Sequence, residues 1–213
     1  MLTVSHDPAA VESQLSSCEL MCPRCSGRLR PWGFARERTI REGVPVVNAQ
    51  VTPRRGRCRG CGATHVLLPG LFAARRADAA AVIAHAIELS TLGLGHRRIA
   101  TVLTRPATTV RDWIRTFAAN APAIFAAFTA RVHRATAQAL GFWPAPASSA
   151  GANALGMLLA HARVLAGEHA AGHGGVVSLP WYYAALAGHG PWFFSTTGWP
   201  VPVQHQPALM RRR

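Results

Sequence analysis

The sequence predicts an α+β chain with an N-terminal four-cysteine zinc ribbon, a helix-turn-helix helical bundle and a poorly ordered C-terminal part. Two Cys-x-x-Cys pairs separated by 32 residues predict the ribbon. A change from strand-like to helical periodicity near Arg76 predicts the bundle. From residue 141 to residue 213 the chain is rich in alanine, glycine and proline, and only 152–166 has the pattern of a helix. The structure of this last region is therefore left uncertain.

Residues 1–20 are expected to form a flexible arm, and residues 21–70 the zinc ribbon. Thiolates from Cys22, Cys25, Cys58 and Cys61 would fill all four positions of a tetrahedral Zn²⁺ site, which is the closed kind found in structural sites. A glycine follows each cysteine pair, and we expect it to adopt a positive φ in the tight turn there. Such a site would hold a small domain together rather than catalyse a reaction.

Three short strands are predicted for the ribbon, at 28–34, 44–51 and 64–68, because these stretches alternate in polarity or carry β-branched residues. The segment between the cysteine pairs is longer than is usual for such sites, and a long hairpin would accommodate it. Two further side chains are candidate ligands. Cys18 is expected to be a spare thiol, and His65 a strand residue at the surface or in the core.

Residues 76–140 are predicted to form the helical bundle. Apolar residues recur at helical spacing over 77–92, and a second, shorter helix is expected at 96–103. Pro106 ends it, and a third helix starts near Thr108 or Thr109, whose hydroxyl would cap the free amides, with Asp112 completing a capping box. A fourth helix is expected at about 122–140. Short helices joined by a tight turn, with another packed across them, form a helix-turn-helix unit.

The charge of the chain favours a polyanionic partner. All 23 basic residues are arginine and only nine residues are acidic, which gives a formal net charge of +14. The N-terminus lacks the pattern of a secretory signal and no apolar run is long enough to span a bilayer, so we expect a cytoplasmic, nucleoid-associated protein that does not contact membranes.

Two groups of side chains are predicted to contact double-stranded DNA. The ribbon group would grip the phosphate backbone, whereas the bundle group would hold the backbone and contact base edges in the major groove. The ribbon group is Arg54, Arg55 and Arg57, and the bundle group is Arg97, Arg98, Thr108, Thr109, Arg111 and Arg115.

Catalysis is not expected. Beyond the third helix the sequence contains one acidic residue, Glu168, so the carboxylate cluster that two-metal strand transfer requires cannot form there. The motif of zinc deaminases is also absent from the sequence. Two alternatives to DNA binding are a ribosome- or RNA-associated zinc-ribbon protein, in which arginine and aromatic side chains meet unpaired bases, and a thiol redox protein that uses Cys22 and Cys25.

Four motifs resemble a group of uncharacterised actinobacterial proteins that are similar to the N-terminal part of insertion-sequence transposases. They are, in chain order, Cys-Pro-x-Cys-x-Gly, Arg-x-Arg-Cys-x-x-Cys-Gly-x-Thr-His-Val-Leu-Leu-Pro, Gly-x-Gly-x-Arg-x-Ile-Ala, and Arg-Pro-x-x-Thr-Val-Arg-x-Trp, which ends at Trp113. The resemblance implies a zinc ribbon and a helix-turn-helix that bind DNA. It covers roughly residues 20–120 and does not include a catalytic domain. The implied role is a transcriptional regulator or a non-catalytic, transposase-derived DNA binder, with a transcription or mobile-element partner. A homodimer would suit a symmetric site, although no heptad repeat specifies one.

Overall fold

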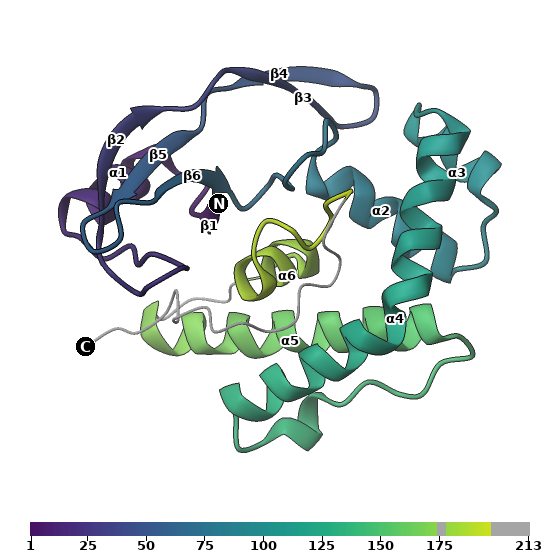
Figure 1. The fold of residues 1–213 in the computed structure, drawn as a ribbon. Coiled ribbons are helices and arrows are strands. Elements are labelled where there is room, and N and C mark those ends of the chain that lie inside the picture. The colour runs from purple at the N-terminus through teal and green to yellow at the C-terminus, as the bar shows by residue number, and fades with distance from the viewer. Residues whose placement is uncertain (174–177, 197–213) are drawn as a thin grey trace. The chain divides into compact units, whose positions relative to one another are not determined.

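The structure is a computed structural model that describes residues 1–173 and 178–196. The chain divides into two compact units (Figure 1). Of the described residues, the first contains 1–42, 47–79 and 186–196, and the second contains 43–46, 80–173 and 178–185. The expected poor order of residues 197–213 concerns positions outside the described ranges. The α+β class is confirmed, because strands dominate the first unit and helices the second.

The ribbon is built on a four-stranded sheet with the strand order β1-β6-β5-β2. Its strands are β1 (Leu2–Val4), β2 (Leu29–Phe34), β5 (Arg54–Cys58) and β6 (Thr64–Pro69). β1 pairs with β6 in parallel, and the other neighbours are antiparallel. A separate hairpin of β3 (Arg38–Glu42) and β4 (Val47–Val51) continues from β2 and β5 (Figure 1). This hairpin accommodates the long segment between the cysteine pairs, as the sequence predicts.

The first 20 residues do not form a flexible arm. They contain β1 and helix α1 (Pro8–Ser16), and Leu2, Val4 and Leu15 are buried in the ribbon core. The carboxylate of Asp7 accepts hydrogen bonds from two amides of the first turn of α1, and proline stands at the first helical position. Both features favour a helix start. The prediction failed because each apolar stretch is too short to be recognised as a strand or helix from the sequence alone. Its order depends on packing against strands that lie later in the chain.

β5 is the strand that the sequence analysis did not predict beside the second cysteine pair. Its residues alternate between the two faces of the sheet, with Gly56 and Cys58 buried. A Cβ on Gly56 would lie 3.4–3.5 Å from Leu15 and Leu29, so glycine allows α1 to pack closely on this face. The alternation is not evident in the sequence, because a cluster of charged residues is more typical of a loop than of a strand.

The second unit begins with three helices, namely α2 (Ala80–Thr91), α3 (His96–Leu103) and α4 (Ala107–Ala135). α3 ends at Thr104, which adopts the left-handed conformation with φ 51°. Ile99, Leu103 and Trp113 are buried where these helices pack on one another. The first two helices lie close to their predicted positions.

The predicted third and fourth helices are one continuous helix. α4 contains Pro122, which removes one backbone hydrogen bond, and the helix changes direction near its middle (Figure 1). The helix nevertheless continues because apolar residues on both sides of the proline, such as Phe117 and Phe128, are buried. Its N-cap is Pro106 and receives no side-chain hydrogen bond, so the expected threonine cap with Asp112 is wrong.

The C-terminal region is more ordered than expected over its described residues. After the short 3₁₀ helix η1 (Ala139–Phe142), helix α5 (Ala150–His173) packs on α4. Helix α6 (Trp181–His189) follows, and its Trp181 donates a hydrogen bond of 2.6 Å to Glu88 of α2. In the first unit Phe193 and Phe194 are buried, and Ala74 donates a backbone hydrogen bond of 2.7 Å to Pro191.

Among the described helices none is both long and apolar enough to cross a bilayer.

Candidate functional site

The four predicted cysteines lie together at one end of the ribbon sheet. Cys22 and Cys25 lie in the turn before β2, Cys58 ends β5, and Cys61 lies in the turn before β6. Their sulfurs all lie within 4.8 Å of one another, with 3.8 Å between Cys22 and Cys61 and 3.4 Å between Cys25 and Cys58. In a tetrahedron with metal–sulfur bonds of about 2.3 Å, neighbouring sulfurs are about 3.8 Å apart. The cluster therefore has the size of a four-thiolate site and could hold a metal ion.

The two cysteine turns share one hydrogen-bond pattern. In the first, the amide of Cys22 donates to the carbonyl of Gly27 at 2.7 Å, and the amide of Ser26 donates back to the carbonyl of Cys22 at 2.8 Å. In the second, Cys58 donates to Ala63 at 2.8 Å, and Gly62 donates back to Cys58 at 3.1 Å. The backbone thus presents each pair of thiols in the same way, without using a side chain.

The glycines after the cysteine pairs have different roles. Gly62 has φ 71°, as expected, but in the first turn the residue with positive φ is Ser26, with φ 58°. Gly27 is required for space instead. A Cβ at Gly27 would lie 2.9 Å from the sulfur of Cys58 and 3.3 Å from that of Cys25, both closer than ordinary contact. A Cβ at Gly60 would lie 3.7–3.8 Å from the same two sulfurs, which is ordinary contact.

His65 and Cys18 stand outside the four-sulfur cluster. His65 is 8% exposed, and its Nε2 lies 3.2 Å from the sulfur of Cys22. It pairs with Gly56 across β5 and β6, which turns it toward the buried face of the sheet. His65 is thus placed to donate a hydrogen bond to a ligand sulfur. Cys18 lies two residues after the end of α1, has φ 56° and is a free thiol apart from the cluster.

Electrostatics within the cluster favour a cation. The pKa of Cys58 is lowered to about 7, chiefly by the backbone N–H of Cys61 and further by the thiol of Cys25 and the backbone N–H of Gly60. The pKa of Cys25 is raised to about 12, because hydrogen bonds with the thiols of Cys61 and Cys58 outweigh the lowering effect of the backbone N–H of Gly27. Neighbouring thiols therefore share protons and resist carrying several negative charges at once, which a bound cation would relieve.

The three ribbon arginines predicted to grip phosphate have different surroundings. Arg54 is 17% exposed; it forms a two-bond ion pair with Glu12 and donates to the carbonyl of Gly33 at 2.6 Å. Its guanidinium also lies 4.6 Å from the ring of Phe34. These contacts connect Arg54 of β5 to α1 and β2, so its guanidinium already has partners within the ribbon. The sequence analysis groups Arg54 with its neighbours, whereas the structure gives it different contacts.

Arg55 and Arg57 point to the other face of the sheet. They are separated by two positions on β5, on the side opposite the buried Gly56. Arg57 pairs with Arg30 of β2, donates to the carbonyl of Gly62 at 3.3 Å, and lies over the ring of Trp32 at 4.5 Å. The solvent side of this sheet therefore carries a cluster of like charges around an aromatic ring.

The bundle residues predicted to contact DNA lie at the α3–α4 corner. Three residues, 104–106, separate α3 from α4. Of the predicted contact residues, Thr109 is half-buried and the others are exposed, whereas Val110 and Trp113 of the same helix are buried. Arg111 lies 3.5 Å from the carboxylate of Asp112, and both side chains are largely exposed. The exposed predicted residues are Arg97, Arg98, Thr108, Arg111 and Arg115.

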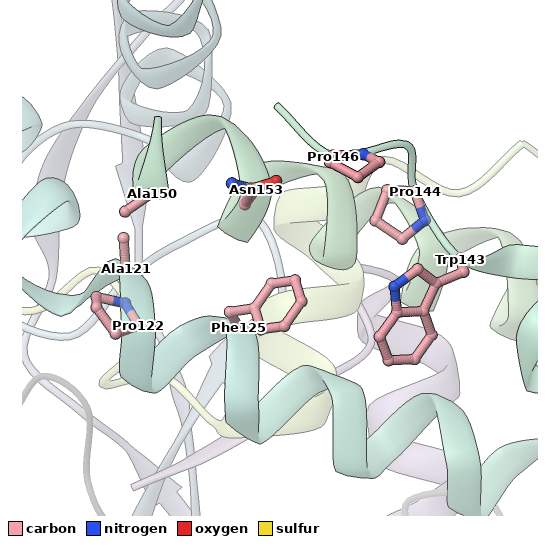
Figure 2. A pocket seen from close by; sticks show the side chains of 8 residues that line it. All are labelled: Ala121, Pro122, Phe125, Trp143, Pro144, Pro146, Ala150 and Asn153. Atoms are coloured by element: carbon pink, nitrogen blue, oxygen red, sulfur yellow. The ribbon is translucent and has the colours of Figure 1, made fainter. Parts of the chain in front are cut away.

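A separate cavity of about 430 Å³ lies between α4, the segment after η1 and the start of α5 (Figure 2). Phe125, Trp143 and several prolines line it. The polar side chain of its lining, Asn153, accepts a hydrogen bond from the amide of Ala147 and donates one to its carbonyl, so it anchors the connecting segment. The lining contains no titratable side chain. The sequence analysis gave no indication of this cavity, because its walls form only when residues 143–153 pack against α4.

No protein-family model, curated protein or solved structure matches this chain. The resemblance to the N-terminal part of insertion-sequence transposases is therefore carried by the four motifs alone, and it stays a prediction.

Proposed function

We propose that this protein is a double-stranded DNA-binding protein whose ribbon is stabilised by a structural Zn²⁺ ion. Cys22, Cys25, Cys58 and Cys61 supply four sulfur ligands, and zinc accepts four thiolates in tetrahedral geometry. Because protein sulfur fills every position, the ion has no place for water or substrate. The hydrogen bond from His65 reduces the charge on one ligand sulfur. In this proposal the cysteines are structural and the thiol redox alternative is rejected.

The observation that carries the DNA-binding proposal is the α3–α4 corner. Two helices joined by three residues are held together by a buried stripe, and the start of the second helix presents exposed threonine and arginine side chains. Arg111 and Arg115 would contact base edges in the major groove, since arginine can donate two hydrogen bonds to guanine. Arg97 and Arg98, on the preceding helix, would contact the phosphate backbone. Thr108 would contact a phosphate or a thymine methyl group.

The ribbon adds non-specific affinity through Arg55 and Arg57, which replace Arg54 in this role. Phosphate contacts release counterions and are therefore sensitive to salt, whereas base contacts change affinity in a sequence-dependent way. The two groups of arginines should thus be separable by experiment. The protein would be a transcriptional regulator or a non-catalytic binder derived from a mobile element, and the position of its binding site would decide between them.

The test is selection of bound fragments from a pool of genomic DNA by purified, zinc-loaded protein at near-physiological salt. We expect enrichment of one sequence motif. Arg111→Ala should then weaken binding to that motif by about 5- to 150-fold, or 1–3 kcal/mol, and weaken random duplex far less. Arg55→Ala should weaken both duplexes alike and reduce the dependence of affinity on salt by about one counterion.

Two results would contradict this proposal. Recovery without an enriched motif, lost as salt is raised, would mean that the α3–α4 corner is only part of a helical bundle. Equal losses for Arg111→Ala and Arg55→Ala would remove the division between base and phosphate contacts. Arg111→Lys is a matched control, because lysine keeps the positive charge but cannot form the two parallel hydrogen bonds of a guanidinium group.

A further inference from the structure

We infer that the solvent face of the ribbon sheet binds an unpaired strand of DNA, with one base stacked on Trp32. This surface is distinct from the duplex-binding corner of α3 and α4. The inference rests on the proposed function only in taking DNA, rather than RNA, as the polymer. Four residues define the surface, which we call the Trp32 platform: Arg30, Trp32, Arg55 and Arg57.

The first support is the exposure of an aromatic ring among charges of one sign. Trp32 is 49% exposed although Arg57 already lies on its ring at 4.5 Å. Large aromatic side chains are usually buried. An exposed aromatic side chain therefore marks a contact site more often than an exposed small apolar side chain does. Leu29 and Gly56 are buried against α1 on the opposite face of the sheet. Trp32 lies at an alternate position of its strand, so its side chain points away from this core.

The second support is that the platform is held in place before any ligand arrives. The guanidinium of Arg57 is fixed between the ring of Trp32 and the carbonyl of Gly62, to which its Nε donates at 3.3 Å. Gly62 belongs to the second cysteine turn, where its amide donates to the carbonyl of Cys58. A metal ion in the cysteine cluster would therefore also order the arginine beneath the indole ring. A preformed surface loses less conformational entropy on binding.

The chemistry of the platform fits an unpaired strand better than a duplex. Arg30 faces Arg57 across the two strands, and Arg55 lies two positions from Arg57 on the same side. These charges complement phosphates along one strand, whereas the indole ring complements the flat face of a base. In a duplex that face is covered by the neighbouring base pairs. Single-strand binding proteins combine the same two elements, a basic track and an aromatic stacking surface.

The test measures fluorescence anisotropy of a labelled 15-nucleotide oligothymidylate with the zinc-loaded, full-length protein at fixed salt. Trp32→Ala should weaken this binding by about 5- to 150-fold, the range that one base–aromatic stack covers. Trp32→Phe should recover most of the loss because it keeps an aromatic face. Trp143→Ala is the matched control, since Trp143 is also an exposed tryptophan (40%) but lies in the second unit, and it should leave binding unchanged.

The same variants separate this inference from the proposed function. Trp32→Ala should keep its preference for the enriched duplex motif, and Arg111→Ala should keep its affinity for oligothymidylate. Failure of the duplex selection would leave the oligothymidylate result intact, and the reverse also holds. Unchanged oligothymidylate binding by Trp32→Ala overturns the inference. Tighter binding of oligouridylate than of oligothymidylate overturns the choice of DNA.

A measurement on the unaltered protein covers the case in which a Trp32 variant does not fold. Photo-crosslinking to an oligonucleotide that carries 5-iododeoxyuridine, followed by peptide mass spectrometry, identifies the aromatic residue that a base contacts. We expect the crosslink on the 29–34 peptide at Trp32. A crosslink confined to other aromatic residues overturns the inference.

Discussion

The ribbon and the bundle reach stability by different routes. The ribbon core consists of leucine and valine side chains together with two of the cysteines, listed as Leu2, Val4, Val11, Leu15, Leu20, Leu29, Leu67, Cys22 and Cys58. The three-helix part of the bundle buries aliphatic side chains together with two large aromatic ones, listed as Ile83, Ile87, Ile99, Leu103, Trp113 and Phe117. A fully buried side chain of this size contributes about 1.5–3 kcal/mol. In the proposed function a metal ion completes the ribbon core, whereas no ion is proposed for the bundle, so the two parts should respond differently to loss of the ion.

The largest effect is expected from removal of the proposed Zn²⁺ ion from the ribbon. Structural zinc contributes an apparent ~10–16 kcal/mol to folding of small zinc domains. Excess chelator, or Cys58→Ser, should therefore unfold the ribbon strands while the helices of the bundle persist. Hydrogen exchange read by mass spectrometry checks this, with backbone protection lost over 1–69 and kept over 80–135. Simultaneous loss in both regions would show that the comparison is wrong and that the two parts fold as one.

The reverse change is a truncation in the bundle. Trp113→Ala removes a side chain that is 2% exposed, and such truncations cost about 3–5 kcal/mol because a cavity is left behind. We expect the helices to unfold at a lower temperature, as measured by circular dichroism. The zinc content of the protein should stay unchanged. A fall in zinc content would show that the stability of the bundle and that of the ribbon are coupled, which would contradict the comparison.

A smaller change tests how tightly the ribbon fits its ion. Gly27→Ala places a methyl group 2.9 Å from the sulfur of Cys58, and overpacking of this kind costs about 1–3 kcal/mol. The sulfur cannot move away without leaving its place in the cluster. Competition with a colorimetric chelator should show weaker zinc binding for this variant. Gly60→Ala is the matched control, because its methyl group has ordinary contact with the same sulfurs and should have little effect.

The sequence predicts those features whose parts are close together in the chain. The cysteine cluster follows from two short motifs, and α3 follows from apolar residues at helical spacing between Gly95 and Pro106. α1 had a local signal, because Asp7 and Pro8 are a favoured helix start, but the arm prediction overlooked it.

Features that depend on pairing between distant segments were not predictable in this way. β1 has only three residues, and its parallel partner lies more than sixty residues later in the sequence. His65 could be placed beside Cys22 only once its register opposite Gly56 was known. The separation of Arg54 from Arg55 and Arg57 likewise requires β5, because alternate positions of a strand point to opposite faces.

The return of residues 186–196 to the first unit has a consequence for biosynthesis. Ala74 binds Pro191 through the backbone, and Arg76 donates to the carbonyl of Phe194 at 2.5 Å. The first unit is thus interrupted by residues 80–185, and a ribosome that adds 5–20 residues per second needs roughly 5 to 20 s to make them. During that interval residues 74–76 lack their partners from Pro191 to Phe194, and the apolar surface that packs on Phe193 and Phe194 stays uncovered. Chaperones that recognise apolar surface on nascent chains would have their opportunity in this interval, before the final segment closes the unit.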